Sequence, residues 1–386
     1  MLFISSIILF FILSITKIKS NNPISFKIQI KHGNDFTIPL FTTKIGNSNI
    51  DTVYSGLNTE NSKIFYAFTP NANCVNKTMN GQCYKGEEKK KLNKTEKISL
   101  FGFTKEGPLY KENIIIGESK FELEFVYVEV LKIYNGYINF GSKSLNYLKN
   151  KKIIPLANIH YSPYDEKTGS MNVTIGSNYS INNAKYYDTC DIIGNLSGCM
   201  LKKINIVNNV KKDDNKTIEI NASAEFFNSE LFQNNETVVV GNSEKLNQII
   251  NELVKYDYTC DKSGIVNCRA PNKTLYLIFG EKGIKLSKIS FHPTAHHSVV
   301  FGFNTFKDID IVIDYDKKKV FFYSGTFNTT STTSNTKSGT TKLIIIISII
   351  VGVLILGAIL FYFLFHKKEK VDIEASGAET LLGEEN

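Results

Sequence analysis

The sequence lacks any stretch of the kind that binds nucleic acid. The formal net charge is +8, but the lysines are spread along the chain, with runs of three only at residues 89–91 and 317–319. No arginine-rich stretch adjoins either run. We therefore exclude nucleic acid as a partner and interpret the lysines as a solvated surface.

Motifs for metal binding and for nucleophilic catalysis are missing as well. No serine or cysteine stands in a recognisable nucleophile motif. Residues 280–283 precede a strand pattern, whereas a phosphate loop precedes a helix, so we predict a hairpin turn. His292, His296 and His297 have no carboxylate or cysteine fixed beside them, and stray histidines on an exposed loop are the better interpretation. We predict no metal and no cofactor.

Cysteine is scarce, and its spacing is not that of a zinc site. The six cysteines form three close pairs, none with C-x-x-C spacing or a histidine partner nearby. We therefore predict disulfides, and the local spacing favours three small loops. The pairs are Cys74/Cys83, Cys190/Cys199 and Cys260/Cys268.

The N-terminus is a hydrophobic run too short to span a bilayer comfortably. Residues 1–20 are mostly apolar and end in Ser20, which predicts a secretory signal peptide cleaved near that residue. An uncleaved N-terminal anchor is the alternative.

A second hydrophobic run lies near the C-terminus. Residues 343–365 carry no charge, and a helix rising roughly 1.5 Å per residue crosses a hydrocarbon core of about 30 Å over that length. His366 and three lysines follow, so the positive-inside rule places residues 366–386 in the cytosol. We predict a single-pass type I protein of the cell surface or an endomembrane.

The region outside the membrane has the composition of a secreted glycoprotein. Residues 324–342 are mostly Ser, Thr, Asn and Gly, which predicts a flexible stalk. Ten N-x-S/T acceptors precede or lie within it, and we expect about half of them to carry sugar. They are Asn76, Asn93, Asn172, Asn178, Asn195, Asn215, Asn221, Asn235, Asn272 and Asn328.

The folded part reads as all-β with few helices. Short apolar and β-branched runs recur between turn residues, and residues 308–323 alternate Ile with Asp before a turn, which predicts a hairpin with one buried face. Residues 243–255 alone have convincing helical spacing, with a serine at the start.

The order of these segments resembles the pepsin-like aspartic proteases. Residues 41–46 (FTTKIG) look like the strand before the family's Ile-Gly turn, and residues 98–117 look like its flap hairpin. Residues 134–145 (YNGYINFGSKSL) are similar to its D-G-I-L-G-L-G segment, and residues 169–176 to the strand closing the first lobe. Residues 299–323 are the best single match, to the end of the second lobe. The resemblance implies a bilobal fold, with lobes at residues 21–185 and 186–323.

The resemblance also implies a site, and the site is degenerate. The family uses two aspartates, one per lobe in a D-T/S-G turn, which share a proton and activate water. Counted from Gly46, the first position falls on Leu57, and the second falls on Asn228. Neither leucine nor asparagine can act as the base. The candidate cleft residues are Leu57, Asn58, Thr59, Phe101 at the flap's tyrosine position, Asn228, Ser229 and Glu230.

Another register does not restore the acids. Asp51 lies too soon after Gly46, and we interpret it as a solvated turn residue. No aspartate occurs between Asp214 and Tyr256. We predict a non-catalytic binding or surface protein whose cleft holds a peptide or protein ligand, or is filled in. The rival hypotheses are an active protease with a displaced acid, and a trafficking receptor whose tail signal includes Glu379, Leu381 and Leu382.

Overall fold

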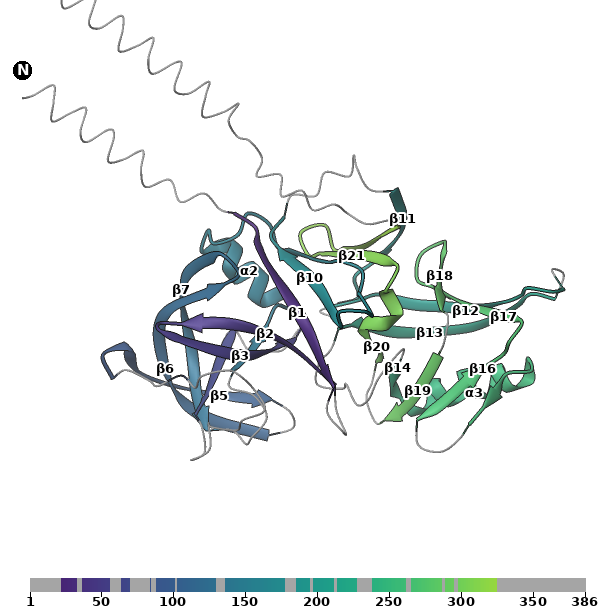
Figure 1. Cartoon of the computed structure of the whole chain (residues 1–386), viewed down its shortest axis with the longest axis horizontal. Helices are drawn as coiled ribbons and strands as arrows, with labels where there is room; N and C mark the ends of the chain where they lie inside the picture. The colour runs from purple at the N-terminus through teal and green to yellow at the C-terminus, as the bar shows by residue number, and fades with distance from the viewer. Residues whose placement is uncertain are drawn as a thin grey trace, which may run out of the picture. The chain divides into compact units, whose positions relative to one another are not determined.

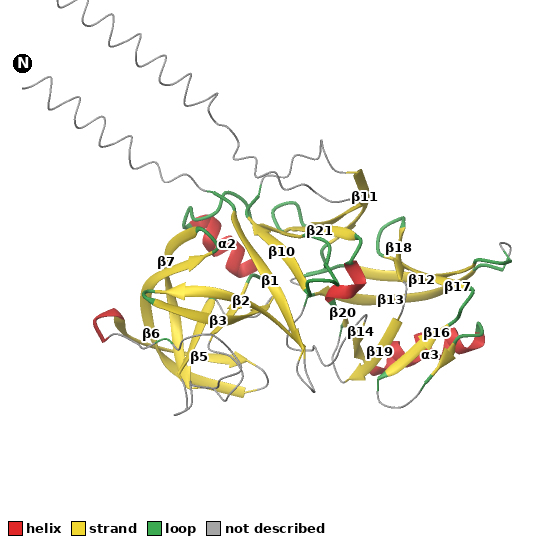
Figure 2. Cartoon of the chain, viewed as in Figure 1, coloured by secondary structure: helices red, strands yellow, loops and turns green. Residues whose placement is uncertain are grey.

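The computed structural model of the chain describes residues 22–32, 37–55, 64–69, 84, 88–100, 103–129, 136–177, 185–194, 197–211, 214–227, 238–261, 265–286, 289–294 and 298–324. All of them lie in the first of two compact units, residues 1–327. They form mostly strands, with two α-helices (Figure 2). No helix among them is long and apolar enough to span a membrane, and residues 343–365 lie outside them.

The first sheet has 13 strands, in the order β11-β22-β21-β9-β10-β1-β2-β3-β8-β4-β7-β6-β5 (Figure 1). It contains strands from both halves of the sequence, which meet where β21 pairs with β9. The strands are β1 (Ile24–His32), β2 (Thr37–Ile45), β3 (Ser48–Ser55), β4 (Phe65–Thr69), β5 (Lys91–Leu100), β6 (Phe103–Ile116), β7 (Ser119–Glu129), β8 (Gly136–Asn139), β9 (Asn158–Tyr161), β10 (Ser170–Ile175), β11 (Lys185–Asp191), β21 (Ile309–Asp314) and β22 (Lys319–Ser324).

The second sheet has nine strands from the later half, in the order β15-β16-β19-β14-β20-β13-β12-β17-β18. They are β12 (Met200–Asn208), β13 (Lys216–Phe226), β14 (Val238–Asn242), β15 (Thr259–Cys260), β16 (Val266–Arg269), β17 (Lys273–Ile278), β18 (Gly283–Leu286), β19 (Ile289–Thr294) and β20 (Val299–Phe301). The helices are α2 (Ser142–Asn150) and α3 (Ser243–Lys255), with short 3-10 turns η1 (Glu88–Lys90) and η4 (Phe303–Phe306).

Tight turns set the register of the first sheet. Ile45 pairs with Ser48, so two residues join β2 to β3, and Gly46 has φ +54° there. Two residues likewise join β6 to β7, where Gly117 has φ +57° and a Cβ would lie 2.0 Å from the Ser25 carbonyl oxygen. Glycine adopts this left-handed backbone without steric cost, which is why it occupies both turns.

The helix predicted from periodicity is confirmed as α3. Its apolar side chains Leu246, Ile249, Ile250 and Leu253 are buried as the spacing predicts. The residue that caps it is Asn242, whose side-chain oxygen accepts the Lys245 N–H at 3.0 Å, so Ser243 is the first helical residue and not the cap. Helix α2 was not predicted, because its nine residues bury only two leucines among polar neighbours.

The predicted hairpin at residues 308–323 is confirmed as β21 and β22. The prediction that only one face of it is buried was wrong. Every residue of β21 is buried, and Asp310 and Asp314 are only 0% and 4% exposed. The alternation of isoleucine with aspartate reflects two different buried faces, since the strand lies in the interior of the 13-stranded sheet.

Candidate functional site

The two lobes repeat one arrangement of strands around a loop. In the first lobe, β8 pairs parallel with β3 and antiparallel with β4, and β4 pairs parallel with β7. In the second, β20 pairs parallel with β13 and antiparallel with β14, and β14 pairs parallel with β19. The connections β3–β4 (residues 56–64, called the first loop) and β13–β14 (residues 227–237, called the second loop) thus fall at corresponding points in the strand order of the two lobes.

The predicted site residues belong to these loops and to the flap. Leu57, Asn58, Thr59, Phe101, Asn228, Ser229 and Glu230 lie outside the residues that the structure describes. The elements beside them are described: β3 ends at Ser55, β13 ends at Phe226, and Leu100 pairs with Phe103. Strands β5 and β6 therefore pair as far as Leu100 and Phe103, on either side of residues 101–102.

Asp51, the acid considered for a displaced active site, is not in a turn. It lies within β3 opposite Thr42 and is partly buried. The prediction of a solvated turn residue was wrong because the β2–β3 turn is only two residues long, which brings Asp51 into the strand.

Sequence reasoning missed a buried acid–base pair where the lobes meet. His160 of β9 donates from Nε2 to Asp310 Oδ1 of β21 at 2.7 Å, and the two side chains are 1% and 0% exposed. Asp310 Oδ2 has no hydrogen-bond partner among the described residues. Because 150 residues separate the pair, no local pattern could have revealed it.

A group of buried or partly buried tyrosines surrounds Tyr161, which lies on the opposite face of β9 from His160. The Tyr54 hydroxyl of β3 is hydrogen-bonded to that of Tyr161 in β9, and the Tyr315 hydroxyl lies 2.8 Å from Ser197 Oγ. Burial raises the pKa of Tyr54 and of Tyr161 far above the ordinary value, and it raises the pKa of Tyr315 to about 12. These hydroxyls stay protonated at any physiological pH, so they act as hydrogen-bonding groups and not as bases.

A buried carboxylate lies in the strand that leads to the second loop. Glu225 of β13 is 6% exposed and accepts a hydrogen bond from the hydroxyl of Ser298, which is 4% exposed. One oxygen of this buried carboxylate therefore has a hydrogen-bond donor, as buried polar atoms normally do.

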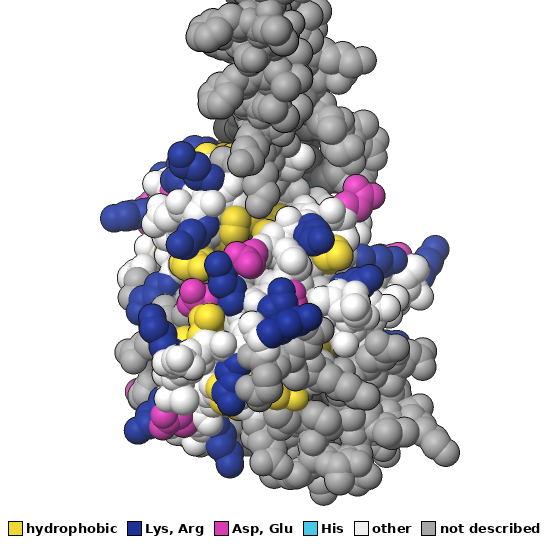
Figure 3. All heavy atoms as spheres, turned by 90° about the vertical axis from the view of Figure 1, so that its left-hand side faces the viewer, with side chains coloured by type: hydrophobic (Ala, Val, Ile, Leu, Met, Phe, Trp, Pro, Cys, Tyr) yellow, Lys and Arg dark blue, Asp and Glu magenta, His cyan; other side chains and the backbone are white. Residues whose placement is uncertain are grey.

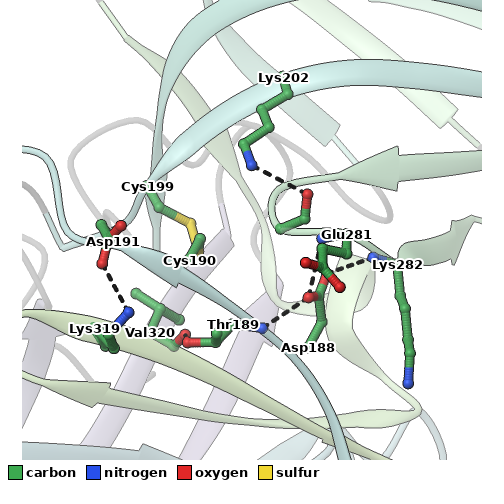
Figure 4. The surroundings of a disulfide bond; sticks show 11 residues. Asp188, Thr189, Cys190, Asp191, Cys199, Lys202, Glu281, Lys282, Lys319 and Val320 are labelled. Carbon is green, nitrogen blue, oxygen red and sulfur yellow. Dashed lines mark hydrogen bonds and ion pairs between the residues drawn. A yellow bond between two sulfur atoms is a disulfide. The ribbon is translucent and has the colours of Figure 1, made fainter.

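Two of the three predicted disulfides are confirmed. Cys190 is bonded to Cys199 and Cys260 to Cys268, while Cys74 and Cys83 lie outside the described residues. Beside the first bond, the buried Asp188 carboxylate accepts the backbone N–H groups of Thr189, Glu281 and Lys282 at 2.8 to 3.1 Å (Figure 4). This carboxylate fastens the β17–β18 turn to β11. The hairpin turn predicted at residues 280–283 is confirmed.

No cluster of three or more His, Cys, Asp or Glu with metal-binding geometry occurs within the described ranges. His292 lies in β19 and is partly buried, while His296 and His297 fall outside those ranges. The face that carries β6 and β7 shows lysine side chains spread over it with acidic groups between them (Figure 3). Lys111 of β6 and Glu122 of β7 form an ion pair at 2.8 Å.

Comparison with solved structures shows the fold. The chain is similar to the aspartic proteinase from Irpex lacteus, with a TM-score of 0.53 and 9% sequence identity. The likeness covers 79% of this chain and 99% of that chain. No family model and no curated protein matches the sequence. The mostly β, two-lobed aspartic proteinase fold expected from the sequence is therefore confirmed, and at this identity the likeness carries the fold alone.

Proposed function

We propose that the chain is a membrane-anchored glycoprotein whose aspartic-proteinase-like domain lacks both catalytic aspartates and acts as a non-catalytic binding or surface module. One observation carries the proposal. The strand bounds limit the two loops to residues 56–64 (GLNTENSKI) and 227–237 (FNSELFQNNET), and neither contains an aspartate. This holds whichever residue of each loop stands at the position of the family's acid.

Loss of both acids removes the groups that activate water for peptide hydrolysis. In the family, one carboxyl group acts as acid while the other acts as base, and neither works alone. The loops still contain glutamates, Glu60 in the first and Glu230 and Glu236 in the second, so these are the acids to test beside Asp51.

The direct test is an assay of the full chain for cleavage of a denatured protein at acid pH. We expect no cleavage that a statine-type inhibitor blocks. Inhibitor-sensitive cleavage that is abolished by Asp51→Asn, Glu60→Gln, Glu230→Gln or Glu236→Gln would establish an enzyme with a displaced acid. A variant of a surface lysine, Lys111→Gln, serves as the control, since it should not change the cleavage rate in either case.

Exposed sequons support the glycoprotein part of the proposal. Asn93, Asn172, Asn215, Asn221 and Asn272 are all exposed, so a glycan on any of them fits outside the core. Enzymatic removal of N-linked sugars from the full chain should lower its apparent mass, and each Asn→Gln change at an occupied site should lower it by one glycan. An unchanged mass would contradict the proposal.

Membrane anchoring rests on residues 343–365, which the sequence makes uncharged and long enough to cross a bilayer. In sealed membranes, protease added outside should remove residues 21–323 and leave a short protected fragment with the C-terminal tail. Release of the whole chain by alkaline carbonate would contradict a transmembrane anchor.

A further inference from the structure

The second loop begins at a residue whose backbone is held in an unusual conformation. The β13–β20 ladder ends at the pair Phe226 and Phe301, and the next N–H, of Phe227, donates to the Phe301 carbonyl at 3.4 Å. Phe227 has φ +60°. A bulky residue in the left-handed region costs of the order of 1–2 kcal/mol, so contacts elsewhere must hold it there.

Those contacts are made by its ring. Phe227 is 0% exposed, and its ring centroid lies 4.1 Å from that of Tyr161, 5.0 Å from Phe303 and 5.7 Å from Phe306. Burying a phenylalanine side chain stabilises a fold by roughly 1.5–3 kcal/mol, which offsets the backbone strain. The ring therefore points into packed aromatic side chains and not into solvent.

The contact with Tyr161 crosses from one half of the chain to the other. Tyr161 belongs to β9, which precedes the second lobe, and its ring also packs against Tyr54 at 6.1 Å between centroids. Tyr54, Tyr161, Phe227, Phe303 and Phe306 thus form a continuous buried group, here called the midline joint, from β3 of the first lobe to η4 of the second. All five are at most 5% exposed.

We infer that the ring of Phe227 closes the midline between the two lobes to ligand. Phe227 is the first residue of the second loop, and it directly precedes Asn228, the position that corresponds to the second acid of an aspartic proteinase. The inference rests on the proposed function and makes it more specific. The sequence allows either a cleft that holds a ligand or a cleft that is filled in, and on the side of the second lobe the cleft is filled in. A partner would then be recognised on other surfaces of the domain, and the midline joint fixes the lobes relative to each other.

The chain contains no tryptophan, so tryptophan fluorescence would come only from a single tryptophan that is introduced. The probe variant is Phe227→Trp, and the exposed reference is Tyr186→Trp, at a position 47% exposed. Both are made in the full chain, and acrylamide quenching is measured with and without a statine-type inhibitor. We expect several-fold weaker quenching at position 227 than at 186, short-wavelength emission, and no effect of the inhibitor.

Strong quenching at position 227, or protection of that tryptophan by the inhibitor, would overturn the inference. If the larger ring prevents folding, Phe303→Trp places the probe in the same joint, and quenching there as strong as at position 186 would overturn it equally. The two assays can fail separately. Cleavage activity with weak quenching at position 227 would contradict the proposed function alone. Strong quenching at position 227 without cleavage activity would contradict only the closed midline.

Discussion

The two faces of β9 and β21, where the lobes meet, have opposite chemistry although the same strands build both. The inner face carries Ile159, Tyr161, Ile311 and Ile313, and its rings join the midline joint. The outer face carries Asn158, His160, Asp310 and Asp314, and it is buried as deeply. A strand in the middle of a large sheet therefore alternates between an apolar and a polar interior, and alternation alone does not indicate solvent.

The difference teaches which face is sensitive to which change. Apolar packing tolerates the loss of a methyl group but not the appearance of a charge. A buried polar pair tolerates joint replacement but not the loss of one member. The predictions below test this contrast from the largest expected effect to the smallest.

Alkali should unfold the domain through tyrosines beside both faces, since Tyr315 follows β21 near the inner-face tyrosines and Tyr323 pairs with the outer-face Asp310. Burial raises the pKa of Tyr315 and of Tyr323 to about 12, above the usual value of about 10. The stabilisation is complete below pH 10, and it falls as pH rises toward the folded-state pKa because the unfolded chain loses its protons first. Tyrosinate absorbance should rise together with the loss of circular dichroism. Full titration near pH 10 in a folded protein would contradict this.

On the outer face, His160→Ala should lower the free energy of unfolding by about 3–5 kcal/mol, because it leaves the Asp310 carboxylate buried without a partner. Denaturant unfolding measures the change. The double variant His160→Leu with Asp310→Leu should recover most of the loss, since it removes both polar groups. A cost below about 1 kcal/mol for the single change would show that the pair contributes little.

Within the inner face, Tyr54→Phe should cost about 1–3 kcal/mol, because the Tyr161 hydroxyl then remains buried without its partner. Tyr54→Phe combined with Tyr161→Phe should be less destabilising than the single change. Thermal unfolding of the three proteins gives the comparison, and additive losses would argue against a hydrogen bond between the hydroxyls.

The smallest effect concerns packing alone. Ile313→Val removes one methyl group from a side chain that is 0% exposed and should cost about 1 kcal/mol. Val210→Ala, at a position 70% exposed, is the matched control and should stay within about 0.5 kcal/mol of the parent. Equal effects at the two positions would mean that β21 does not lie in the core.

The sequence predicts elements whose information is local. Helix α3 follows from the spacing of Leu246, Ile249, Ile250 and Leu253, and the β21–β22 hairpin follows from its alternation and turn. The aspartic proteinase fold follows from the order of such segments, even at 9% identity to the Irpex lacteus enzyme.

The site could be predicted only in part, because position in a loop is not local information. A count from Gly46 to Leu57 crosses the two-residue β2–β3 turn and runs past Ser55, where the described residues end. The pairing of His160 with Asp310 and of Tyr161 with Phe227 depends on segments brought together by the whole sheet. The sequence does show that neither loop contains an aspartate. The strand bounds make this informative, because they define where each loop begins and ends.

The pairing of β9 with β21 has a consequence for biosynthesis. Strand β9 is translated before the midpoint of the chain, but one of its edges finds its partner only when residues 309–314 emerge, near the end of the folded domain. Until then the nascent protein presents an unpaired strand edge of the kind that joins other chains. Truncation before Ile309 should therefore give an aggregating protein, whereas truncation after Ser324 should leave a domain that folds and stays monodisperse.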